Sequence, residues 1–181
     1  VELLVPGNNN PVAADLKSGD RLKVTYLGYN IIKAEATATY SGTVTAVNYT
    51  TGALTLRENG GNTRYFTFTA VSSITKGSYS YSVLENHLFI NDRIAVTQTG
   101  NGSLDISILS ERTGTVGVSG AQYIYLVNSS KPGDWTGYKI TDECYVHNSG
   151  STAKMAPTAI APNAIVTIYY TDDKVYEIVK K

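Results

Sequence analysis

The chain has 181 residues, and its 15 basic and 15 acidic side chains give a formal net charge of zero at pH 7. This balance excludes the positive field with which proteins bind nucleic acid, and no apolar run approaches the roughly 18 residues of a membrane-spanning helix. Cys144 is the only cysteine, which excludes an intramolecular disulfide. We therefore expect no nucleic-acid partner and no membrane insertion.

The first predicted element is a short apolar strand at residues 1–5. Its apolar side chains are Val1, Leu3, Leu4 and Val5. An extended segment of this length can add a strand to the exposed edge of another sheet. We therefore predict that these four residues form a donor strand for a neighbouring subunit.

Strands with alternating apolar and polar residues follow along the chain. Residues 21–26 place Leu22, Val24 and Tyr26 on one face and polar side chains on the other. This alternation predicts a sheet with one buried face. Equivalent apolar positions recur at equal spacing, and we expect all of them to be buried. They are Leu22, Ile94 and Val166, together with Val24, Val96 and Ile168.

The order of landmarks repeats with a period of 72 residues. The run at 42–44, Gly-Thr-Val, returns at 114–116, and the apolar positions above follow the same step. Repetition at a fixed period indicates an array of like units. We therefore divide the chain into an incomplete N-terminal unit at residues 1–41, which is the closing half of a repeat, and two complete β-repeats at 42–112 and 113–181.

Each complete repeat is predicted to hold five to six short strands. Gly- and Asn-containing turns such as 59–62 and 100–102 separate the strands, as tight hairpins require. Pro157 and Pro162 confine the helix-friendly segment 151–163 to a turn or two. The predicted fold is therefore all-β, with tandem small antiparallel β-barrels or compact sandwiches.

The run from Asp15 to Val24, DLKSGDRLKV, and the Gly-Thr-Val start at 42–44 resemble the β-rich tandem repeats of bacterial S-layer and related cell-surface proteins. The resemblance spans nearly the whole chain, although Asn91 stands where the first copy has Gly19, and 163–164 read Asn-Ala where Gly-Asp is expected. It implies a secreted, extracellular protein at the cell surface that assembles with itself. It implies no catalytic residues.

Candidate catalytic and metal-binding residues are few. Cys144 and His147 have the spacing of half a zinc site, but residues three apart on a strand point to opposite faces, which favours a buried cysteine and a surface histidine. The glutamates needed for glycosidase chemistry are scattered, and no nucleophile motif accompanies the histidines. We predict no enzyme activity and no cofactor. Asp172 and Asp173 can help to hold a structural calcium ion, although turn formation is the favoured interpretation.

One insertion departs from the repeat. Residues 128–137 replace a plain turn and contain the only tryptophan, Trp135. With Tyr123, Tyr125 and Tyr138 it forms a predicted ligand or subunit contact, because aromatic rings can stack on a sugar. The alternative is that Trp135 folds back over the end of the barrel or sits in a subunit interface.

These patterns predict a structural extracellular protein, a self-assembling subunit or segment of an S-layer or surface filament. The expected partner is a second copy of the chain, in a homo-oligomer, sheet or filament. The alternative is a carbohydrate- or cell-wall-binding β-module whose ligand is a polysaccharide. A surface rich in Tyr and Thr with no net charge suits both functions.

Overall fold

The computed structural model describes residues 1–5, 11–16, 21–68, 72–82, 85–100, 102–128, 131 and 133–181. The Gly-Asp pair at 19–20, on which part of the family resemblance rests, lies outside them. The described residues form strands and two single-turn 3-10 helices, so the all-β prediction is confirmed. No helix among them is long and apolar enough to cross a membrane.

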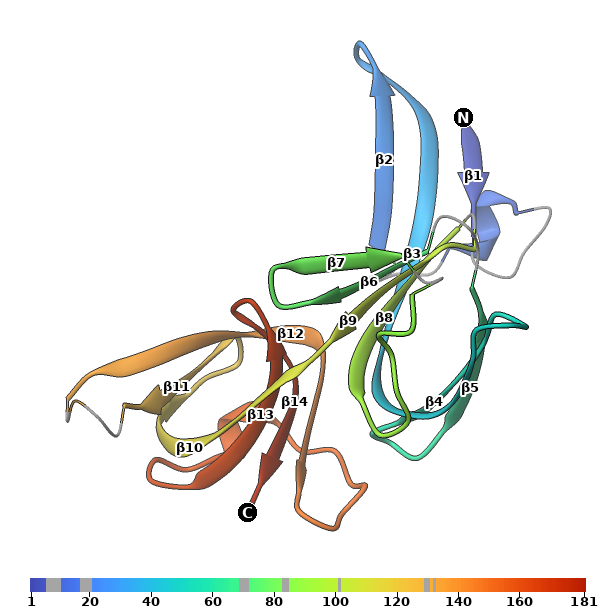
Figure 1. Cartoon of the computed structure of the whole chain (residues 1–181). Coiled ribbons are helices and arrows are strands. Elements are labelled where there is room, and N and C mark those ends of the chain that lie inside the picture. The colour runs from blue at the N-terminus through green and yellow to red at the C-terminus, as the bar shows by residue number, and fades with distance from the viewer. Residues whose placement is uncertain are drawn as a thin grey trace.

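The elements follow one another along the chain with short connections (Figure 1). They are β1 (Glu2–Leu4), η1 (Ala13–Asp15), β2 (Arg21–Leu27), β3 (Asn30–Asn48), β4 (Ala53–Glu58), β5 (Thr63–Thr67), β6 (Ser73–Lys76), β7 (Tyr79–Ser82), β8 (Arg93–Thr99), β9 (Leu104–Ile108), β10 (Ser110–Ser119), β11 (Tyr123–Val127), β12 (Trp135–Asn148), η2 (Pro157–Ala159), β13 (Ile165–Thr171) and β14 (Lys174–Lys180).

The first sheet contains nine strands. Its order is β5-β4-β3-β8-β9-β6-β7, and β1 and β2 both pair with β3. The long strand β3 joins two regions, because its first half pairs with β1 and β2 and its second half pairs with β4. Figure 1 shows β2 and the first half of β3 projecting from the rest of the sheet.

The second sheet is a closed barrel in the order β10-β11-β12-β14-β13. Closure depends on β12, whose first half pairs antiparallel with β11 and whose second half pairs parallel with β14. No single described strand of the first sheet has the role of β12. Its strands β5 and β6 lie before and after residues 69–71, and the described strands of this sheet do not form a closed barrel. The prediction of tandem small barrels is therefore too specific, since only the second sheet is a closed barrel.

Each sheet encloses its own apolar core. The first core contains Val44, Leu54, Leu56, Phe66, Ile74, Leu88, Ile94, Val96, Leu104, Ile106 and Ile108. The second contains Val116, Ile124, Leu126, Tyr138, Ile140, Cys144, Val146, Ile160, Val166, Ile168, Val175 and Ile178.

Two of the six positions expected to be buried are not. Ile94, Val96, Val166 and Ile168 are fully buried, whereas Leu22 is 41 % exposed and Val24 is half-buried. The reason is positional, because β2 has a strand neighbour on one side only among the described residues.

Candidate functional site

A row of exposed aromatic side chains runs across the outside of the barrel. Tyr123 and Tyr125 are alternate residues of β11 and therefore share one face, and Trp135 begins the neighbouring strand β12. Their exposed fractions are 45 %, 37 % and 52 %. The ring centroids are 6.4 Å apart from Tyr123 to Tyr125 and again from Tyr125 to Trp135. We call these three residues the aromatic row.

Two glycines let the rings lie against the sheet. Gly137 pairs directly with Tyr125, and a Cβ atom at Gly137 would lie 2.7 Å from Cε1 of that ring. A Cβ atom at Gly117 would lie 3.0 Å from Cε2 of Trp135. Because each ring covers a glycine with one face, its other face is left toward the solvent. Glycine inside a strand often marks such a close approach, so these two glycines are a sequence signal for the row that aromatic residue type alone does not provide.

Tyr138, the fourth predicted member, does not belong to this row. It pairs with Ile124, and residues directly opposite in a sheet share a face, so it points into the barrel with that buried side chain. Its hydroxyl accepts a hydrogen bond of 2.6 Å from Nη1 of Arg112. Tyr138, predicted as a ligand or subunit contact together with the row, therefore lies in the barrel core and does not share the exposed face of the row.

A polar cavity of about 580 Å³ lies beside the aromatic row, where the barrel faces the first sheet. Tyr123 belongs to both the row and the cavity. The first sheet contributes Thr37, Thr39 and Thr97. The barrel contributes Gln122, Tyr123, Lys139, Ile140, Thr141, Asp142, Glu143, Lys174 and Tyr176. Hydroxyl, amide, ammonium and carboxylate groups next to flat aromatic faces form a surface that suits a ligand with many hydroxyl groups.

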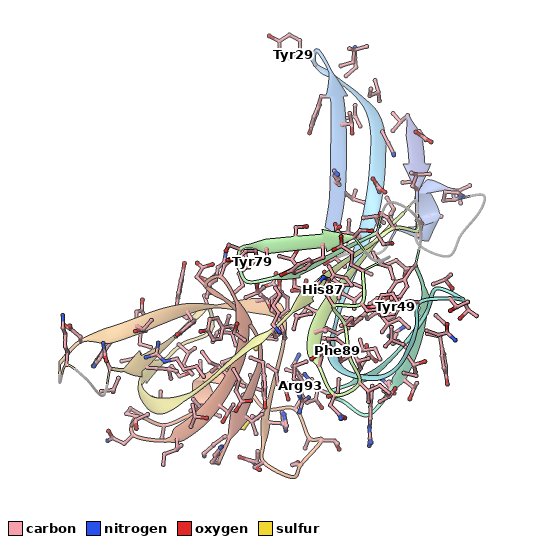
Figure 2. All side chains as sticks on the ribbon, viewed as in Figure 1. Tyr29, Tyr49, Tyr79, His87, Phe89 and Arg93 are labelled. Carbon is pink, nitrogen blue, oxygen red and sulfur yellow. The ribbon has the colours of Figure 1, made fainter. Side chains whose placement is uncertain are left out.

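A charged cluster joins the first sheet to the barrel. Glu177 is 1 % exposed, and its carboxylate lies 3.2 Å from Nη1 of Arg93 and 3.0 Å from Nε2 of His147. Arg93 also donates a hydrogen bond to Oδ1 of Asn59 and lies over the ring of Tyr169. Figure 2 shows Arg93 at the end of the first sheet that faces the barrel.

The remaining polar atoms of His147 are also occupied. Its Nδ1 atom lies 2.8 Å from the carbonyl oxygen of Ser151, while Nε2 faces Glu177. Cys144 points into the barrel core, where burial raises the pKa of its thiol to about 12. The two side chains therefore do not converge. The described residues contain no group of three or more His, Cys, Asp or Glu placed to hold a metal ion.

The predicted donor strand lies in the sheet of its own chain. Leu3 and Leu4, in β1, pair in parallel with Ala34 and Glu35 of β3. Val1 is 86 % exposed, and Leu3, Leu4 and Val5 are half-buried. Donation of this segment to a neighbour would first require these backbone pairings to break.

Comparison with known proteins assigns no family. Neither a known protein family nor a curated protein matches the chain. A function is therefore inferred from the strand pairing and from the aromatic row beside the polar cavity.

Proposed function

We propose that the chain is a structural segment of an extracellular array that assembles with itself, such as an S-layer or surface filament, built from like β-units with a period of 72 residues. In this proposal residues 42–112 and 113–181 are copies of one unit. Residues 1–41 are the closing half of another. The protein has no catalytic role.

The observation that carries the proposal is the agreement in strand register beside the closing hairpins. The opening hairpins differ by two residues, because Val44 pairs with Leu56 whereas Val116 pairs with Leu126. Thr43 pairs with Arg93, and Thr115, 72 positions later, pairs with Ile165, also 72 positions later. The parallel pairs behave in the same way, because Ile74 pairs with Ile106 and Val146 pairs with Ile178. Agreement of both antiparallel and parallel pairs supports a common strand arrangement.

The cores support the same proposal. Leu88 and Ile160 are both fully buried and lie 72 positions apart, each before the closing hairpin of its unit. Phe66 of β5 and Tyr138 of β12 are also buried and lie 72 positions apart. The charged cluster does not follow the period as a whole, since Arg93 corresponds to Ile165 and His147 to Thr75, although Glu177 corresponds to Asp105. Units that share their core packing but not an arrangement of polar side chains are typical of an extended scaffold and not of a repeated catalytic site.

Sedimentation velocity over a range of protein concentrations tests this function. Large species that grow with concentration are expected, because the surface has no net charge to oppose association. A single species of monomer mass at all concentrations would contradict self-assembly.

A second candidate function is binding of a polysaccharide, and the aromatic row beside the polar cavity favours it. Sugar rings would stack on Trp135 and Tyr125 while their hydroxyl groups reach the cavity. Affinity electrophoresis in gels that contain a soluble cell-wall polysaccharide tests this function. Trp135→Ala should abolish the retardation, whereas Tyr65→Ala, at an 80 % exposed site on β5 of the first sheet, should retain it. Equal retardation of the two variants would exclude the aromatic row as the binding surface.

A further inference from the structure

The N-terminal hairpin has the same strand register as the closing hairpins of both complete units. Leu22 pairs with Ala36 in the hairpin of β2 and β3, Ile94 with Ile108 in that of β8 and β9, and Val166 with Lys180 in that of β13 and β14. Corresponding residues of successive hairpins are 72 positions apart. The parallel strand beside each hairpin is also present, as β1, β6 and the second half of β12.

The three hairpins differ on one edge. In each complete unit the first strand of the hairpin also pairs antiparallel with a strand that contains a Gly-Thr-Val run. In this way β8 pairs with β3, and β13 pairs with β10. Among the described residues, β2 has no strand on this edge. We call the segments that cover the edge in the complete units, within residues 37–68 and 110–140, the opening halves.

The missing neighbour leaves apolar side chains in solvent. Leu22 is 41 % exposed, whereas its counterparts Ile94 and Val166 are fully buried. Tyr26 and Leu27 are 60 % and 70 % exposed further along β2. Figure 2 shows Tyr29 at the tip of the hairpin, away from the rest of the molecule. An open strand edge next to exposed apolar side chains favours association with another strand.

We propose that the N-terminal hairpin is an acceptor site for an opening half of the same repeat. The incoming strand pairs antiparallel with β2, as β3 does with β8, and its apolar side chains cover Leu22 and Val24. The complete units identify this partner, because each shows an opening half in register on the same edge of the same hairpin. This inference rests on the proposed array and specifies how its units join.

A graft within one chain tests the site. Residues 37–43 pair with β8, and Glu2 is the counterpart of Ser73, because Glu2 pairs with Lys33 and Ser73 pairs with Asp105, 72 positions after Lys33. A second copy of residues 37–72 fused directly before Glu2, in place of Val1, therefore completes the unit in its natural order. A matched control carries Val44→Asp and Leu56→Asp in the grafted copy only, because both residues are fully buried in the existing unit. The measurement is amide hydrogen exchange of β2, with β8 and β13 as internal references for a folded chain.

The graft should slow exchange of the β2 amides at least tenfold, and the control graft should leave them as in the unmodified chain. The site is disproved if β2 stays unprotected while β8 and β13 keep their protection, or if both grafts protect it equally. The opening halves of this chain already pair with β8 and β13. Protection of β2 that rises with concentration of the unmodified chain would therefore show that another surface of a second copy covers the edge, and would also overturn the assignment. Protection by the graft together with a monomeric unmodified chain would retain the acceptor site and contradict only self-assembly.

Discussion

Arg93 and Glu177 connect the two sheets through a contact of 3.2 Å between Nη1 and Oε2. Arg93 begins β8 of the first sheet, and Glu177 lies in β14 of the barrel. The carboxylate is almost completely buried, whereas the guanidinium side chain is 33 % exposed. This asymmetry makes the junction sensitive to loss of the arginine, because a buried carboxylate without its partner is costly.

Arg93→Met should destabilise the protein by about 1–3 kcal/mol, below the usual loss for a fully buried pair because Arg93 is partly in solvent and His147 still contacts Glu177. Urea unfolding measures the change. Glu177→Gln removes the charge that Arg93 balances, so the double variant should lose less stability than the sum of the single variants. Strict additivity would show that the contact contributes nothing to stability.

Ile94→Ala and Leu22→Ala form a matched pair, because the two residues occupy equivalent hairpin positions. The first substitution leaves a cavity in a fully buried site and should cost about 2–5 kcal/mol. The second removes a side chain that is 41 % exposed and should change stability by only about 0.5 kcal/mol. Equal losses in chemical denaturation would mean that β2 is covered in solution.

The Cys144 thiol should resist labelling in the folded protein. Desolvation raises its pKa from an ordinary value of 9.0 to about 12, so the folded state holds the proton that the unfolded state loses. Stability from this group is therefore complete below pH 9 and declines as pH rises from 9 toward 12. A disulfide reagent at pH 8 should react only after unfolding. Rapid labelling of the native protein would contradict the buried position.

Comparison with Cys144→Ala isolates this effect. Between pH 9 and 10 the parent protein should lose stability faster than the variant. Above pH 10 two half-buried tyrosines also contribute, because desolvation raises the pKa values of Tyr169 and Tyr170. Parallel stability curves between pH 9 and 10 would show that Cys144 does not resist ionisation.

Local patterns in the sequence predicted the strands well. Alternation at Ile94 and Val96 indicated that these residues lie on a buried face, and both residues are buried in the structure. The same alternation at Leu22 was misleading, because burial also requires a neighbour across the strand edge, and alternation within a strand contains no information about that neighbour. Barrel closure was unpredictable for a similar reason, since it depends on whether one strand, such as β12, bridges two partners.

The candidate site was predicted only in part. Residue type indicated the exposed tryptophan and the tyrosines of β11, but it could not show that Tyr138 faces the barrel core, because that orientation depends on the pairing with Ile124. The contact between Arg93 and Glu177 joins residues 84 positions apart in different sheets, so no short motif signals it.

Negative-stain electron microscopy of the purified protein tests the proposed structural function most directly. We expect sheets or fibres with a regular repeat, because like units with no net charge to oppose association favour ordered extension. Discrete particles of one size, at concentrations where the protein is folded, would contradict the proposed self-assembly.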